Sequence, residues 1–250
     1  MKRYFIYLSY NGENYCGWQI QPNAITVQEA LEQSFSTILR HPVSITGAGR
    51  TDTGVHARMM AAHFDLKEES FDLPLFVRRL NSILPKDISV NKIVEVKKDA
   101  HARFDAISRL YRYYITTRKD PFLHPFKYRI FDSPDIERMN ACANILFEYE
   151  DFTSFSKLHT DVKTNNCTVM QAGWEKLRDD YIFTIQANRF LRNMVRSIVG
   201  TLLEVGRHKI GIDDFRYIIE AKDRGRAGTS APGHALFLEE IEYNDSIFIK

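Results

Sequence analysis

The sequence predicts an α+β protein made of two β-α-β-β-α-β units. Hydrophobic residues alternate in some segments, as in strands, and recur every three or four residues in others, as in helices. The order of these segments in the first half is repeated in the second, and 250 residues suffice for two modest domains. We therefore expect an N-terminal domain over residues 1–105 and a C-terminal domain over 106–250. Their antiparallel sheets are expected to join side by side, with the helices packed on one face.

The first half has clear start signals for both of its helices. Thr26 and Glu29 have the spacing of a capping box, and Pro74 suits the first turn of a helix. Alternating apolar residues with many aromatics indicate the strands. The expected elements are a strand at 2–10, a helix at 27–39, strands at 43–47 and 59–65, a helix at 74–84 and a strand at 87–97.

The second half repeats this order with one added helix. Ser133 and Pro134 mark the start of its first helix. The expected elements are a strand at 109–117, a helix at 134–147, strands at 167–177 and 180–188, helices at 189–205 and 213–222, and a strand at 236–243. Ferredoxin-like and RNA-recognition folds share this element order. The order alone does not identify a function, because many functions use it.

Charge is distributed unevenly along a chain whose net charge is only +2. Residues 101–130 carry seven basic and two acidic side chains, with seven Phe and Tyr residues among them. Residues 186–209 carry five basic side chains and one acidic one. Cations interleaved with aromatics suit a phosphate backbone and unstacked bases. The alternative is a strand with a solvated charged face.

Several classes of protein are disfavoured by composition. Cys16, Cys142 and Cys167 are odd in number and form no Cys-x-x-Cys pair, which argues against a disulfide framework or zinc site and for the reducing cytoplasm. No histidine pair has the spacing of a zinc site, so we expect no metal. No apolar run approaches the ~20 residues of a membrane span, so we expect no membrane partner.

The most informative motif is the signature loop, residues 47–56, which reads GAGRTDTGVH. Three glycines free the backbone around Arg50 and Asp52, and the loop lies between two expected strands. A rigid scaffold can present such side chains to a ligand. The alternative is a simple turn in which Asp52 bonds neighbouring backbone amides and Arg50 pairs with it on the surface.

With the following alanine, the loop resembles the GAGRTDAGVHA motif of the TruA-type tRNA pseudouridine synthases, with Thr53 in place of the commoner alanine. The resemblance spans nearly the whole chain. Its further segments are Tyr10-Asn11-Gly12, Tyr15 to Gln19, Leu80 to Pro85, His101 to Phe104 and Asp151 to Phe155. The resemblance implies that Asp52 is the catalytic nucleophile.

A second group of candidate residues lies in the expected helix at 189–205. Arg189, Arg192 and Arg196 fall at i, i+3 and i+7, which predicts a basic stripe near the start of the helix. Cations there oppose the helix dipole, so local stability does not explain them. The alternative is an amphipathic helix with a solvated cationic face. Residues 192–200 also resemble the family motif Arg-Asn-Met-Val-Arg-x-Ile-Val-Gly, which implies that Arg196 pairs with Asp52.

The resemblance implies roles for other residues. Tyr111 is expected to stack on the target base, Arg50 to fill the gap left by the flipped nucleotide, and Leu236 to line the pocket. Ala235 stands where the family usually has glycine. Tyr111 and Leu236 could instead be ordinary core residues of strands. Further tRNA contacts are expected from Arg189 and Arg192, in the second basic block, and from the positions that match the family: His101, Arg103, Lys119, His159 and Lys163.

The resemblance therefore implies a cytoplasmic, homodimeric enzyme that isomerises uridines 38, 39 and 40 in the anticodon arm of tRNA. The reaction is neither a redox step nor a group transfer to a second molecule, so no cofactor is expected. Asp52 could attack C6 of the base or C1′ of the sugar. Two alternatives stay open: a paralogous synthase with other target uridines, and a non-catalytic RNA-binding protein or chaperone.

Overall fold

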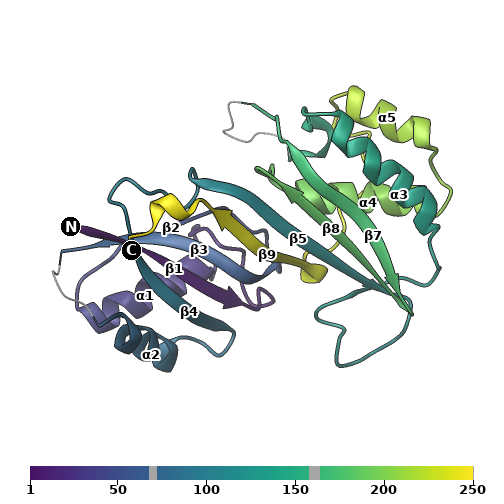
Figure 1. The fold of residues 1–250 in the computed structure, drawn as a ribbon. Coiled ribbons are helices and arrows are strands. Elements are labelled where there is room, and N and C mark those ends of the chain that lie inside the picture. Colours follow the sequence, from purple (N-terminus) through teal and green to yellow (C-terminus); the bar gives the residue numbers. More distant parts are fainter. Residues whose placement is uncertain (68–71, 158–163, 250) are drawn as a thin grey trace. The chain divides into compact units, whose positions relative to one another are not determined.

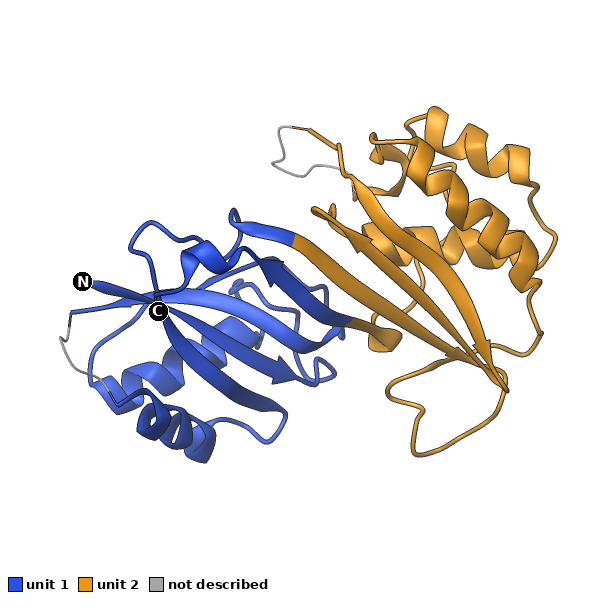
Figure 2. Ribbon diagram, viewed as in Figure 1, with its two compact units in different colours: residues 1–107, 238–250 blue, residues 108–237 orange. Residues whose placement is uncertain are grey.

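The computed structural model describes residues 1–67, 72–157 and 164–249, which form two compact units (Figure 2). Unit 1 contains residues 1–107 and 238–250, and unit 2 contains residues 108–237. Both units combine strands with helices (Figure 1), so the predicted α+β class is confirmed.

Unit 1 is a sheet with two helices. Its elements are β1 (Lys2–Tyr10), α1 (Val27–Leu39), β2 (Thr46–Gly47), β3 (His56–Leu66), α2 (Leu73–Ile83), β4 (Ile88–Val96) and most of β9 (Leu236–Tyr243). The strand order is β4-β1-β3-β9, and β2 pairs with β3. Strand β1 is antiparallel to both neighbours, with Ile6 opposite Ala62 and Ile93.

The helix starts of unit 1 agree with the sequence signals. The Thr26 hydroxyl accepts a hydrogen bond from the Glu29 amide at 3.3 Å, so α1 begins where the capping pattern places it. Pro74 lies in the first turn of α2. The ring of Phe35 on α1 contacts Phe64 on β3 at 4.8 Å and Phe76 on α2 at 5.0 Å. These buried rings join both helices to the sheet.

Most of β9, the last strand, belongs to unit 1, whereas the sequence predicts that it is part of a C-terminal domain over 106–250. The Tyr243 ring lies 5.1 Å from that of Phe5, and its hydroxyl donates to the Ala102 carbonyl at 2.6 Å. Glu239 forms an ion pair with Arg58 at 3.3 Å. The chain therefore returns to unit 1 after completing unit 2, a pairing that local sequence patterns do not encode.

Among its described residues, unit 2 has an antiparallel sheet of three strands, a short fourth strand that pairs in parallel, and helices. Its elements are most of β5 (Ala106–Thr116), β6 (Tyr128–Arg129), α3 (Ile136–Ile145), β7 (Val169–Leu177), β8 (Asp180–Ala187), α4 (Met194–Gly206) and α5 (Ile212–Glu220). The strand order is β5-β8-β7, and β6 pairs with β5. Asn140 joins α3 to the edge strand β7, because its side chain bonds both the amide and the carbonyl of Trp174.

The predicted helix at 189–205 is wrong at its start, because α4 begins at Met194. Asn193 precedes it with φ of 68°, a left-handed conformation that a helix cannot continue through. Arg189 and Arg192 therefore lie before the helix, and only Arg196 is on it. The predicted stripe of three arginines on one helix face does not exist.

Candidate active site

The signature loop is held in place by the last residue of β1 and by the segment that follows it. The Tyr10 hydroxyl and the Thr51 hydroxyl share a buried hydrogen bond of 2.9 Å. The Thr51 carbonyl accepts from the Trp18 amide at 3.3 Å, and the Gly54 amide donates to the Tyr15 carbonyl at 3.3 Å. These contacts fix the backbone on both sides of Asp52.

Two glycines allow this close approach. Gly17 has φ of +86°, and a Cβ there would lie 2.3 Å from the Thr51 carbonyl oxygen. A Cβ on Gly12 would lie 2.0 Å from the Val55 carbonyl oxygen, and the Gly12 amide donates to His56 Nδ1 at 3.0 Å. Larger residues at either position would push the signature loop away from its support.

Asp52 is half-buried at the apex of this loop. Its backbone closes the turn, since its carbonyl accepts from the Val55 amide at 3.1 Å. Arg50 and Thr53 are exposed on either side. Because Thr53 faces solvent, its difference from the family's alanine changes no buried packing. The arrangement presents one carboxylate on a fixed backbone.

In unit 2, Arg196 is oriented by a hydrogen bond from its own side chain. Its Nε donates to the Ala231 carbonyl at 2.7 Å, and the Ala231 amide donates to the Arg196 carbonyl at 2.9 Å. Gly200 lets the chain approach α4 this closely, because a Cβ there would lie 1.9 Å from the Thr229 carbonyl oxygen. The Asn193 side chain donates to Ser230 Oγ at 2.6 Å and ties down the start of the same helix.

Tyr111 and Tyr113, both on β5, have different surroundings. Tyr113 is fully buried and its hydroxyl donates to the Pro232 carbonyl at 2.9 Å. Burial raises the pKa of Tyr113 well above its usual value. Tyr111 is half-buried, with its ring edge-on to Phe190 at 5.1 Å. Tyr113 is thus the core aromatic, and Tyr111 keeps surface on which a base could stack.

Leu236 begins β9 directly after a single 3-10 turn, Gly233–Ala235. It is 5% exposed, which agrees equally with a pocket-lining and a core role. Ala235 is fully buried and does not have a positive φ, so alanine fits without backbone strain where the family usually has glycine.

The other predicted RNA contacts are distributed over both units. In unit 1, the half-buried His101 lies with its ring 4.5 Å from that of His63, and Arg103 is exposed. Burial lowers the pKa of His101. In unit 2, Lys119 and Arg192 are exposed and Arg189 is half-buried. His159 and Lys163 lie outside the described residues.

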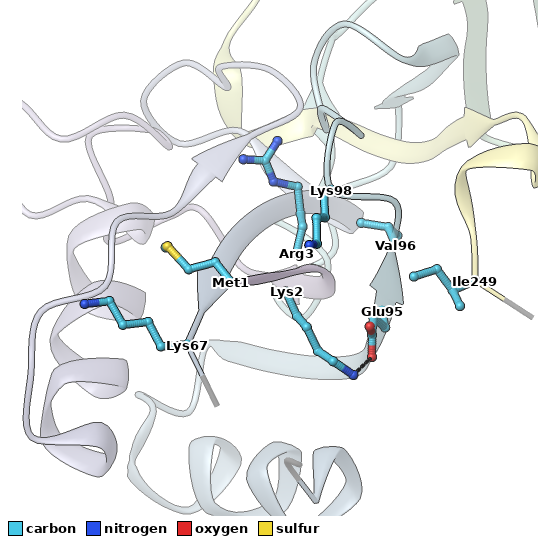
Figure 3. Close-up of a pocket in the computed structure, with 8 residues that line it drawn as sticks. All are labelled: Met1, Lys2, Arg3, Lys67, Glu95, Val96, Lys98 and Ile249. Atoms are coloured by element: carbon cyan, nitrogen blue, oxygen red, sulfur yellow. Dashed lines mark hydrogen bonds and ion pairs between the residues drawn. The ribbon is translucent and has the colours of Figure 1, made fainter. Parts of the chain in front are cut away.

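The hollow in Figure 3 is a separate feature of unit 1, with a volume of about 290 Å³. Met1, Lys2 and Ile249 line it, and Lys2 bonds Glu95 at 3.0 Å. The signature loop contacts the opposite end of β1, which is nine residues long. At about 3.3 Å per residue these ends lie about 26 Å apart. The hollow contains none of the predicted site residues.

Sequence reasoning missed the residues that support the site. Tyr10 and Trp18 lie in a segment that matched the family, but no role was inferred for them, and Asn193 was placed inside a helix. Among the residues that the structure describes, no group of three or more His, Cys, Asp and Glu side chains could hold a metal ion. Within the same residues, no helix combines the length and apolar character needed to cross a membrane.

Comparison with known proteins identifies the family. A family model described as tRNA pseudouridine synthase matches residues 6–105 and 149–244. The chain belongs to this family. Proteins named tRNA pseudouridine synthase A are 60% identical in Parabacteroides distasonis, over 99% of this chain and 98% of that one, and 59% identical in Bacteroides fragilis, over 99% of both. The relative in Porphyromonas gingivalis is 55% identical over the full length of both chains.

The resemblance inferred from the signature loop is therefore confirmed, and the family is one of isomerase enzymes. Asp52 and Arg196 lie within the segments matched by the family model, whereas Tyr111 and Lys119 lie between them. The relatives cover this intervening region as well, since they align over 99% or more of the chain.

Proposed function

We propose that this protein converts uridine to pseudouridine at positions 38, 39 and 40 in the anticodon arm of tRNA, with Asp52 as the nucleophile. The main support is the half-buried Asp52 on a loop whose backbone is fixed on both sides, in a chain of the tRNA pseudouridine synthase family. A positioned carboxylate can form a covalent intermediate and split a difficult rearrangement into easier steps.

The reaction is an isomerisation. The bond between N1 of uracil and C1′ of ribose breaks, the base turns, and a bond forms between C5 and C1′. The hydrogen on C5 leaves as a proton, and N1 gains a proton, so atoms and charge balance without an oxidant or a cofactor. A carboxylate that adds at C6 would keep the detached uracil bound, and one that adds at C1′ would keep the ribose bound, while the base turns.

In this proposal Arg196 is the cationic partner of Asp52. A nearby positive charge favours the ionised carboxylate, which is the nucleophilic form. The Arg196 Nε bond to the Ala231 carbonyl at 2.7 Å supports this role, because it fixes the plane of the guanidinium. The target uridine must leave its stem to be reached. Tyr111 would stack on it, Leu236 would line its pocket, and Arg50 would fill its place in the RNA.

The remaining basic residues would bind the RNA backbone. We propose contacts from His101, Arg103, Lys119, Arg189, Arg192, His159 and Lys163. Phosphate contacts release counterions, so tRNA affinity should fall steeply with salt although the whole chain carries only +2. We further propose that the enzyme is a homodimer, which analytical ultracentrifugation would test. We also propose that it acts in the cytoplasm, which cell fractionation would test.

Mapping pseudouridine in tRNA from a deletion strain tests the assignment. Loss at positions 38–40, restored by the wild-type gene and not by Asp52→Asn, is the expected result. Loss at other positions instead would indicate a paralogous synthase. An unchanged pseudouridine map, together with tight RNA binding by the purified protein, would indicate a non-catalytic RNA-binding protein.

A further inference from the structure

The loop between β5 and β6, residues 117–127, carries an exposed phenylalanine whose ring does not pack into the core. Phe122 is 86% exposed. Among the residues that the structure describes, its ring has no aromatic or cationic contact. A large apolar ring left in water is available to contact another molecule; single exposed apolar side chains are common, so the inference rests on what surrounds Phe122.

The ends of this loop are firmly attached to unit 2. The Thr117 amide donates to the Asp179 carbonyl at 2.9 Å, and Lys127 Nζ lies 2.5 Å from the Asp180 carboxylate. The Phe126 ring packs 6.2 Å from that of Phe237. The loop therefore leaves and rejoins the sheet at fixed points, beyond the end of β5 (Figure 1).

The tip of the loop is also ordered. The Asp120 carboxylate accepts from the amides of Phe122 and Leu123 at 2.9 and 3.3 Å. The Leu123 carbonyl in turn accepts from the amides of Phe126 and Lys127 at 2.9 and 3.1 Å. Pro121 restricts the backbone between these anchors. Phe122 is thus held outward by a preorganised turn, which lowers the entropy cost of binding.

The charges beside Phe122 favour a polyanion as the partner. Arg118 and Lys119 are exposed, and within the described part of the chain neither has an ion-pair partner. The nearest acid in the sequence, Asp120, is engaged by the backbone amides of the tip. An aromatic face beside free cations is the arrangement that binds an unstacked base and its adjoining phosphates.

We propose that Phe122 is a stacking platform for an unpaired base of the tRNA, outside the nucleotide that reacts, with Arg118 and Lys119 on its phosphates. Thr116, at the end of β5, is five residues beyond Tyr111. At about 3.3 Å per residue, the loop begins about 17 Å from the proposed target-base site. Phe122 would then position the RNA and not contact the reacting atoms. The inference rests on the proposed function only in taking tRNA as the RNA.

The test uses tryptophan at the tip as a direct probe. Trp18 and Trp174 are buried, so Phe122→Trp adds the only exposed indole among the described residues. We expect an RNA oligonucleotide of the anticodon stem-loop to quench this indole. Phe131→Trp is the matched control, because Phe131 is 87% exposed in the same unit and has Arg129 over its ring. Its emission should change little.

Binding measurements complete the test. Phe122→Ala should raise the Kd for the stem-loop roughly 5- to 150-fold, Phe122→Trp should restore affinity, and Phe131→Ala should leave it within about twofold. An unquenched Phe122→Trp, or an unchanged Kd in Phe122→Ala, overturns the inference. Unchanged affinity with loss of the oligomer would assign the tip to contacts between copies. RNA-dependent quenching without pseudouridine formation by the wild type would refute the proposed function alone.

Discussion

The signature loop of unit 1 and the start of α4 in unit 2 are held in place in different ways. The signature loop is fixed by contacts of Thr51 and Gly54 with the end of β1 and the segment after it, most of them through the backbone. Arg196 is oriented through its own side chain, whose Nε donates to the Ala231 carbonyl. Both regions also depend on a glycine that allows close approach, Gly17 in one and Gly200 in the other.

Because the two regions are held differently, they should respond differently to substitution. The loop that carries Asp52 is held by contacts of Thr51 and Gly54, and these contacts remain when Asp52 is replaced. Arg196 helps to hold the segment that orients it, so its replacement removes a charge and a structural contact together. Substitutions in the two regions should therefore separate chemistry from positioning.

Asp52→Asn should have the largest effect on activity. The amide keeps the shape of the side chain but is no nucleophile, so pseudouridine formation should fall at least about 10³-fold, roughly 4 kcal/mol. Affinity for tRNA should stay within about tenfold, or 1.4 kcal/mol. The matched control is Thr53→Ala, an exposed neighbour that should react at the wild-type rate. Substantial turnover by Asp52→Asn would exclude Asp52 as the nucleophile.

Arg196→Met should have the next largest effect on activity, and a larger effect than Arg192→Met. Asp52 and Arg196 are both half-buried, so losing the cation should cost less than the about 3–5 kcal/mol of a fully buried ion pair. Arg192 is exposed and lies before the helix, so its loss should weaken tRNA binding and reduce the salt slope by about one. Single-turnover rates at saturating tRNA, together with tRNA affinities measured across salt concentration, separate the two; a wild-type rate for Arg196→Met contradicts the pairing.

Gly17→Ala and Gly200→Ala test the supports themselves. Each added Cβ would meet a carbonyl oxygen, at 2.3 Å and 1.9 Å respectively, and Gly17 also has a positive φ. Each should lower the free energy of unfolding by about 1–3 kcal/mol and reduce kcat. Gly49→Ala is the control, since no heavy atom among the described residues lies within 4 Å of its added Cβ. Equal stability of all three variants by urea denaturation would show that the close approaches are not needed.

The smallest expected effect on activity comes from a pH dependence of stability in unit 1, which leaves the chemistry itself unchanged. Burial lowers the pKa of His63 from 6.5 to about 4, and its Nδ1 accepts from the Ala102 amide at 3.2 Å. The folded state thus binds fewer protons than the unfolded state between these values. Stability should fall by up to about 3 kcal/mol as pH drops from about 6.5 to about 4.

Trp18 provides the probe for this titration, because it is buried in unit 1. In a Trp174→Phe background, urea denaturation followed by Trp18 fluorescence reports unit 1 alone. His63→Gln keeps an acceptor for the Ala102 amide and should flatten the pH dependence. A slope that persists in His63→Gln would assign the titration to other groups.

Local patterns were sufficient for much of the prediction. The helix starts at Thr26 and Pro74 depend on residues within one turn, and both are present where expected. The signature loop lies between β2 and β3, as the glycines and flanking apolar runs indicated, although β2 has only two residues. The family was also recognisable from the sequence, because its motifs are short and contiguous.

The start of α4, the exposure of Tyr111 and the placement of β9 were decided by tertiary structure. Residues 189–193 have helical spacing, but Asn193 adopts a left-handed conformation and bonds Ser230, 37 residues away. Tyr111 and Tyr113 are two residues apart on one strand, so the sequence pattern places them on the same face, yet only Tyr113 is fully buried. The sequence determined which elements form, because capping and periodicity act over a few residues. Tertiary structure decided which side chains they bury and where the chain stops being helical, because those outcomes depend on contacts between distant segments.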